Sequence, residues 1–204
     1  MTELLTARIK KLNEALLDIN QNEDELIKLI TENIPEWTRL LKCKQHDIHD
    51  YTLDIHTLHV IKKIREFKTF GELKEFDRLV LLYAALLHDI EKKENEVDPE
   101  HPYRGAKKSG EILYKLGFTE NFTNRVYLLI NYHQILGLIG SGKVSFPFEE
   151  LAAIYKDPLL LDLQTMLSIA DIKSVKKNEA FFNEKMNKKI HEAVEGIKFF
   201  IKND

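Results

Sequence analysis

The feature that most constrains this chain is an uninterrupted apolar run that ends in a histidine and an aspartate. Residues 79–87 are all aliphatic or aromatic, and His88 and Asp89 follow directly. If this run is helical, it is apolar on every side, which is typical of a helix buried in the middle of a domain. The end of such a helix is expected to be buried too, so the Asp89 carboxylate needs a cation beside it.

Two interpretations of the His88-Asp89 pair are open at this point. A His-Asp pair at a helix end can simply cap carbonyl groups and face water, as we expect for the second such pair, His46-Asp47, which lies in a polar stretch. The apolar run before His88 favours the other interpretation. In that case a neutral imidazole and a carboxylate bind a divalent metal ion.

Composition narrows the class of protein. With 204 residues and 44% hydrophobic content, the chain is long enough for one domain with a full core. Its 30 Lys and Arg nearly balance its 33 Asp and Glu, so no nucleic-acid partner is expected. The single cysteine, Cys43, excludes an intrachain disulfide and a cysteine-based zinc motif. No secretory signal or membrane span is visible, which predicts a cytoplasmic protein without a membrane partner.

Hydrophobic residues recur every three or four positions along the whole chain, and no segment alternates with a period of two. Helices are predicted at about 3–19, 24–33, 54–67, 79–87, 99–117, 120–136, 149–155, 159–175 and 179–202, with a short one around Trp37. Asp98 and Pro99 are expected to cap and start the helix at 99–117, and residues 137–148 to form the longest loop. The predicted fold class is all-α, a compact bundle of roughly eight helices.

Several residues with metal-binding side chains fall on apolar helix faces or at helix ends. His56 lies in the first turns of its predicted helix, and His133 and Asp171 each continue the apolar face of theirs. A lone histidine on such a face is more often a core residue than a ligand, so the whole set matters more than any one member. That set is His56, His88, Asp89, His101, His133 and Asp171.

The order and local context of these residues resemble the HD superfamily of metal-dependent phosphohydrolases. The resemblance covers about residues 51–175 and rests on five motifs: YTLDIHTLHV (51–60), LLHDI (86–90), His101 with Gly105-Ala106, INYH (130–133) and LSIADI (167–172). Within the superfamily, the motifs are most similar to the HD domain of the bacterial uridylyltransferase/uridylyl-removing enzymes. The resemblance implies an HD domain at 51–175. Residues 1–50 would then form a helical layer packed on it, and residues 176–204 a helix that completes the same domain.

The resemblance also implies a set of metal ligands. One ion would be held by His56, His88, Asp89 and Asp171, and His101 and His133 could bind a second. With a single ion, His101 or His133 would instead bind phosphate or act as a general acid. Iron, manganese, cobalt, nickel and zinc suit such ligands, with magnesium as a further option. A water on such an ion has a lowered pKa and can attack a phosphate ester as hydroxide.

Candidate substrate contacts lie close to these ligands. Many HD proteins read His-Asp-Ile-Gly-Lys, whereas this chain has Glu91 at the glycine position and keeps Lys92. Lys92 is a candidate phosphate contact, its alternative being an exposed loop lysine. Arg104 and Lys107 are further candidates that would otherwise be solvated. The candidate catalytic residues are Asp89, Lys92, His101 and His133.

These residues predict a hydrolase that uses a metal-activated hydroxide to cleave a phosphomonoester or phosphodiester, with a small phosphorylated molecule such as a nucleotide as partner. The alternative is a regulatory or scaffold HD protein that binds metal or nucleotide with little or no turnover. The complete ligand set favours the enzyme. The exchange of glycine for Glu91 favours the scaffold slightly. The sequence gives no indication of oligomeric state.

Overall fold

The computed structural model describes residues 3–46, 50–175 and 182–203, and these form helices joined by turns and loops. The elements are α1 (Glu3–Leu17), α2 (Glu23–Asn33), the 3₁₀ helix η1 (Pro35–Leu40), α3 (Leu53–Arg65), the 3₁₀ helix η2 (Lys68–Glu72), α4 (Glu75–Leu87), α5 (His101–Lys115), α6 (Glu120–Asn131), α7 (Ile135–Gly140), α8 (Phe148–Tyr155), α9 (Pro158–Lys173) and α11 (Glu184–Asn203). The all-α fold class is confirmed. The described part of the chain has ten α-helices, slightly more than the eight expected, and no strand.

Helix α4 carries the apolar run and lies at the centre of the core. Every residue from 79 to 90 is buried, including His88 and Asp89. The helix is surrounded because it packs against α1, α3, α5, α6 and α9. The predicted buried helix is therefore confirmed, and the pair at its end lies inside the protein.

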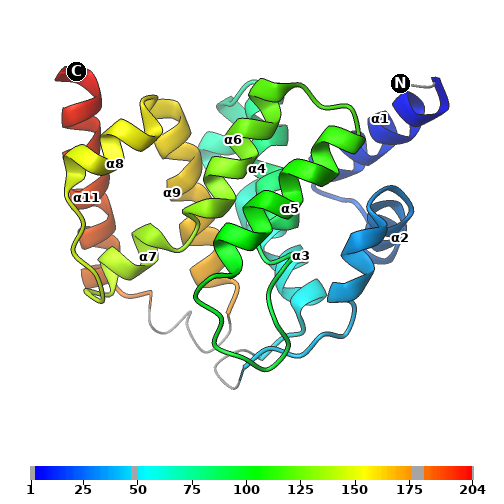
Figure 1. Cartoon of the computed structure of the whole chain (residues 1–204), viewed down its shortest axis with the longest axis horizontal. Coiled ribbons are helices and arrows are strands. Elements are labelled where there is room, and N and C mark those ends of the chain that lie inside the picture. Colours follow the sequence, from blue (N-terminus) through cyan, green and yellow to red (C-terminus); the bar gives the residue numbers. More distant parts are fainter. Residues whose placement is uncertain (1–2, 47–49, 176–181, 204) are drawn as a thin grey trace.

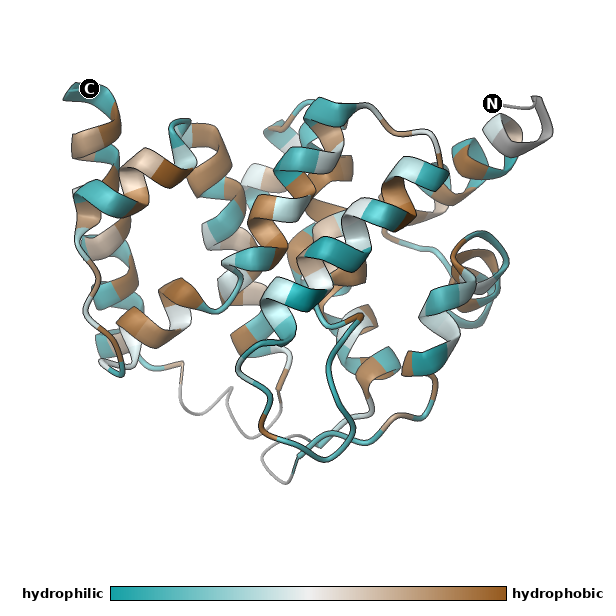
Figure 2. Cartoon of the chain, in the orientation of Figure 1, coloured by the Kyte–Doolittle hydropathy of each residue, from teal (hydrophilic) through white to brown (hydrophobic). Residues whose placement is uncertain are grey.

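The other helices are arranged along a long axis (Figure 1). Helices α1 and α2 lie at one end and α8 and α11 at the other, with α4, α5 and α6 between them. Buried residues from α1 to α11 belong to a single hydrophobic core. The loop between α4 and α5 is mostly hydrophilic, as Figure 2 shows. Among the described residues, none of the helices has the length and hydropathy needed to cross a bilayer.

The start of α5 differs from the prediction. The helix begins at His101, and Pro102 rather than Pro99 lies in its first turn. Asp98 does not cap this helix, because its carboxylate accepts hydrogen bonds from the Lys93 backbone N–H and from the Arg104 side chain. The sequence offers two possible starts close together, Asp98-Pro99 and Glu100-His101-Pro102, and the helix begins at the second.

The region after α6 also differs. The helix predicted to end near residue 136 ends at Asn131. A separate helix, α7, covers residues 135–140 and so includes the first four residues of the predicted loop at 137–148. The loop was predicted from three glycines and Pro147, but in the structure two of these glycines, Gly137 and Gly140, allow close packing of helices. A Cβ on Gly140 would lie 2.7 Å from Ile190 Cγ1, and one on Gly137 would lie 3.2 Å from Ile172 Cδ1. In the last predicted helix, residues 179–181 lie outside the described residues, and α11 begins at Glu184.

Candidate metal centre

Six side chains from distant parts of the sequence meet beside the end of α4. His56 comes from α3, His88 and Asp89 directly follow α4, and Asp171 lies in the last turn of α9. The remaining two are His101, the first residue of α5, and His133, in the turn between α6 and α7. All are buried except the Asp171 side chain, which is 21% exposed. The structure brings all six predicted residues together, although they form two adjacent groups and His133 lies in a turn and not within a helix.

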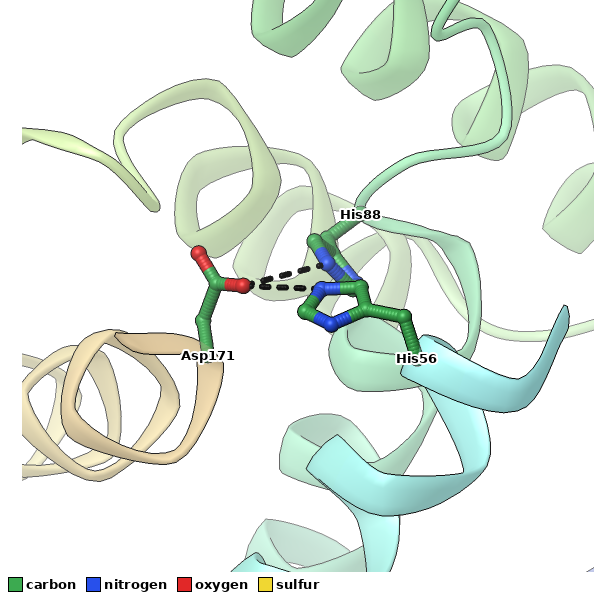
Figure 3. A group of neighbouring side chains, drawn as sticks. All are labelled: His56, His88 and Asp171. Atoms are coloured by element: carbon green, nitrogen blue, oxygen red, sulfur yellow. Dashed lines mark ion pairs between the residues drawn. The ribbon is translucent and has the colours of Figure 1, made fainter. Parts of the chain in front are cut away.

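The first group consists of His56, His88 and Asp171, whose potential ligand atoms all lie within 4.8 Å of one another. Asp171 Oδ1 is 3.0 Å from His56 Nε2 and 3.7 Å from His88 Nε2. Figure 3 shows one carboxylate oxygen facing both rings. Two imidazoles and a carboxylate thus surround one point at the edge of the core.

The second group consists of Asp89, His101 and His133, whose potential ligand atoms also lie within 4.8 Å of one another. Asp89 Oδ1 is 3.0 Å from His101 Nε2. His101 Nε2 is in turn 3.3 Å from His133 Nε2. The other Asp89 oxygen, Oδ2, is 3.6 Å from His88 Nε2 and 3.9 Å from His56 Nε2. Asp89 therefore lies between the two groups and faces both.

Backbone contacts define the tautomers of three of the histidines. The Nδ1 atoms of His88 and His133 contact the carbonyl oxygens of Ala85 and Ile130 at 2.7 and 2.8 Å. His101 Nδ1 makes the same contact with the Asp98 carbonyl. A carbonyl oxygen only accepts hydrogen bonds, so each Nδ1 carries the proton. In the neutral rings, each Nε2 lone pair then faces the centre, the arrangement expected of metal-ligating histidines.

These residues fit a divalent cation. Within the described residues, the buried His88 Nε2 has no hydrogen-bond partner. The Nε2 atoms of His101 and His133 face each other with two lone pairs at 3.3 Å, an arrangement that is repulsive unless positive charge lies beside them. Imidazole nitrogen and carboxylate oxygen together suit iron, manganese, cobalt, nickel and zinc. A cation in each group would satisfy these atoms.

The environment also maintains the protonation states that a metal requires. Burial, together with the nearby rings of His88 and His101, lowers the pKa of His133 to about 3, and burial lowers the pKa of His88 as well. Burial alone would raise the pKa of Asp171, but the hydrogen bond from His56 and the neighbouring imidazoles hold that pKa well below its usual range. Neutral imidazoles and ionised carboxylates are the forms that bind metals.

Lys92 also lies at this centre. Its Nζ is 2.8 Å from Asp89 Oδ2 and donates a second hydrogen bond, at 2.9 Å, to Gln45 Oε1. Burial would raise the pKa of Asp89, but Lys92 and the adjacent imidazoles lower it strongly. Glu91, which stands at the usual glycine position, forms an ion pair with Arg39 at 2.8 Å. Gln45 was not predicted, because nothing in a polar stretch with no periodicity indicates what it contacts.

The other two candidate phosphate contacts lie elsewhere. Arg104 pairs with the Asp98 carboxylate and donates to the Glu91 carbonyl, so it stabilises the loop between α4 and α5. Lys107 is exposed on α5. Within the described residues, neither forms a hydrogen bond or an ion pair with the six converging side chains. Asp47, from the second His-Asp pair, lies outside the described residues.

Comparison with known proteins agrees with this geometry. The model of the HD domain family matches residues 53–173. The chain is similar to the bifunctional uridylyltransferase/uridylyl-removing enzymes of Bordetella avium (29% identity over 72% of this chain and 19% of the relative), Ruegeria pomeroyi (29%, 71% and 17%) and Acinetobacter baylyi (32%, 68% and 17%). The chain thus spans less than a fifth of the length of these relatives. Since the family match covers more than half of the chain and includes all six converging residues, the chain belongs to the HD domain family, a superfamily of metal-dependent phosphohydrolases.

Proposed function

We propose that this chain uses one or two divalent metal ions to hydrolyse a phosphomonoester or phosphodiester, and that the substrate is a nucleotide. The observation that supports this most directly is the meeting of four histidines and two aspartates in two adjacent groups. Three of the imidazoles have Nδ1 on a backbone carbonyl and Nε2 turned inward. A structural role alone would not require so many buried, ionisable side chains to face one another.

The protein side chains supply much of what phosphate ester hydrolysis needs. When bound, the metal would lower the pKa of water and offset negative charge on the phosphoryl oxygens. His56, His88, Asp89 and Asp171 would hold it, and His101 and His133 would be available for a second ion. With a single ion, His101 or His133 would instead bind phosphate or act as a general acid, which requires its inward Nε2 to gain a proton. Lys92 adds a positive charge beside Asp89, and phosphoryl transfer depends on such positioning and charge.

The names of the relatives suggest which substrates to test. They are called uridylyl-removing enzymes, and a uridylyl group attached to another molecule is a phosphodiester of uridine. The substrate panel should therefore contain the p-nitrophenyl ester of UMP together with bis-p-nitrophenyl phosphate, p-nitrophenyl phosphate and the common nucleotides. Comparing the aryl esters distinguishes phosphodiesterase from phosphatase activity.

The first prediction concerns the pair at the end of α4. Purified protein should contain one or two equivalents of a divalent metal by elemental analysis and should hydrolyse at least one substrate of this panel. His88→Ala and Asp89→Ala should each reduce metal content and lower kcat more than about 100-fold, since even outer partners of ligands are worth roughly 10–100-fold. His191→Ala is the matched control, because it removes an exposed histidine on α11 that belongs to neither group of candidate ligands.

Two other outcomes would change the assignment. Bound metal without hydrolysis across the panel would favour the regulatory or scaffold alternative, in which the ligand set serves binding alone. Absence of metal after anaerobic purification, combined with absence of activity when metals are added back, would contradict both functions.

A further inference from the structure

A segment that precedes the family match in the sequence packs alongside the turn that contains His88 and Asp89. Residues 37–45 precede the matched region, which begins at residue 53. The buried Trp37 Nε1 donates a 3.0 Å hydrogen bond to the carbonyl of Leu86, near the end of α4. Further along, the Asn95 backbone N–H donates to the Lys44 carbonyl at 3.2 Å. This segment therefore contacts both ends of the turn that contains Asp89 and Lys92.

Gln45 is the residue of this segment that reaches the centre. Its side chain is largely buried, and it lies between two partners. Nε2 donates to the Tyr51 carbonyl at 3.1 Å, and Oε1 accepts from Lys92 Nζ at 2.9 Å. The orientation of the amide is fixed, because a carbonyl needs a donor and an ammonium needs an acceptor. Gln45 thus connects the backbone ahead of α3 to the lysine at the centre.

This contact restrains Lys92, which would otherwise be a flexible side chain. An ammonium group has three donors. In the described part of the chain, one is directed to Asp89 Oδ2 and one to Gln45 Oε1, and the third has no partner. The Lys92 side chain remains 14% exposed. Its nitrogen is therefore held between two acceptors while one donor stays available to a ligand.

We propose that Gln45 is a positioning residue that holds the Lys92 ammonium where it can bind a phosphate oxygen of the substrate. This rests on the proposed phosphohydrolase function. Asp89 attracts Lys92 as well, but Asp89 also faces the four histidines. Gln45 provides a neutral acceptor that fixes the ammonium without adding negative charge near the phosphate. The segment that precedes the HD domain match would thus complete the substrate site.

The contact itself can be tested without turnover. In ¹⁵N-labelled protein supplemented with Zn²⁺, an ammonium held by two acceptors should give a lysine side-chain NMR signal, assigned by its loss in Lys92→Met. Gln45→Met keeps the length of the side chain but removes both polar groups, and it should abolish or broaden that signal. Arg39→Met is the matched control. It breaks the ion pair with Glu91 in the same segment and should leave the signal in place.

Binding of UMP and of inorganic phosphate, measured by calorimetry, tests the role in the site. Gln45→Met should weaken binding about tenfold, in keeping with the loss of one hydrogen bond to a charged group, and should raise KM more than it lowers kcat. In a Lys92→Met background, the same change should have no further effect, because Gln45 acts through Lys92. Metal content should be unchanged throughout.

The outcomes separate this proposal from the function on which it rests. Suppose that the wild type hydrolyses a substrate or binds UMP or phosphate. The role of Gln45 is then overturned if Gln45→Met leaves binding and KM unchanged. It is also overturned if Gln45→Met weakens binding equally in the Lys92→Met background, or if Gln45→Met lowers the metal content. If the wild type binds neither probe and hydrolyses nothing, the phosphohydrolase function and the role of Gln45 both fail, even where the NMR signal shows the contact.

Discussion

At the scale of single residues, two imidazoles at the centre each have two roles. His88 and His133 follow the ends of α4 and α6, and the Nδ1 of each donates to a carbonyl three residues earlier. Carbonyls in the last turn of a helix lack a partner within the helix, so these rings act as caps. The same hydrogen bonds direct each Nε2 inward. Capping and metal binding, which are alternatives for His88 when the sequence alone is considered, are therefore compatible in one side chain.

Burial of neutral imidazole predicts how stability depends on pH. The pKa of His133 is about 3 in the folded chain, against about 6.5 in the unfolded chain. Between these values the unfolded chain binds more protons, so the free energy of unfolding of metal-free protein should fall as pH drops from about 6.5 towards 3. The slope is at most about 1.4 kcal/mol per pH unit for each proton. Urea unfolding at a series of pH values measures it.

His133→Gln is the comparison for this effect, because it removes one titrating group from the buried set. Its unfolding free energy should depend less steeply on pH than that of the wild type, with a difference of at most one proton. His88 contributes with the same sign, so some slope should remain. Equal slopes in the two proteins would contradict the inference that His133 is neutral when buried.

At the scale of elements, close helix packing predicts opposite effects for two glycines. A Cβ on Gly196 of α11 would lie 2.4 Å from Phe148 Cδ2, whereas one on Gly110 of α5 would have its nearest neighbour at 3.9 Å. Gly196→Ala should destabilise by about 1–3 kcal/mol, because the Phe148 ring has to move. Gly110→Ala should stabilise by about 0.5–1 kcal/mol through helix propensity. Urea denaturation of both variants measures these effects, and a neutral or stabilising Gly196→Ala would contradict the packing.

The helices differ in how well the sequence predicts them. Helix α4 was predictable because its apolar run leaves no other arrangement than burial. Helix α7 was not, because a six-residue segment with two glycines has little helical propensity of its own. It is stabilised by packing against α9 and α11, and such contacts leave no periodic pattern within the segment.

The contacts at the centre also differ in how well the sequence predicts them. His56, His88, Asp89, His133 and Asp171 could be predicted because each lies at a buried end or on an apolar face. The contact between Gln45 and Lys92 could not, since it joins residues 47 positions apart through a non-helical stretch. Arg104 was predicted as a phosphate contact from its position one turn after His101. Its pairing with Asp98 depends on a loop conformation that spacing does not specify.

At the scale of the whole molecule, the centre joins elements that span most of the chain. The candidate ligand side chains come from α3, the end of α4, the start of α5, the turn after α6 and the end of α9. A cation that binds only the folded state would add stability, about 2.7 kcal/mol at 100 times its Kd. For a chain of this size, that corresponds to a rise in Tm of about 5–10 °C.

Calorimetry before and after chelation, and after metal is added back, measures this shift. His88→Ala should show no rise in Tm when metal is added, whereas His191→Ala should show the same rise as the wild type. A chelated wild type with an unchanged Tm would mean that the metal does not link these helices.

The hydrogen bond from Trp37 to Leu86 has a practical consequence. Trp37 is the only tryptophan in the chain, is fully buried, and contacts the backbone two residues before His88. Its fluorescence therefore originates beside the centre and from no other place in the molecule. The emission of unlabelled protein can therefore report metal loading, substrate docking and unfolding from a single known position.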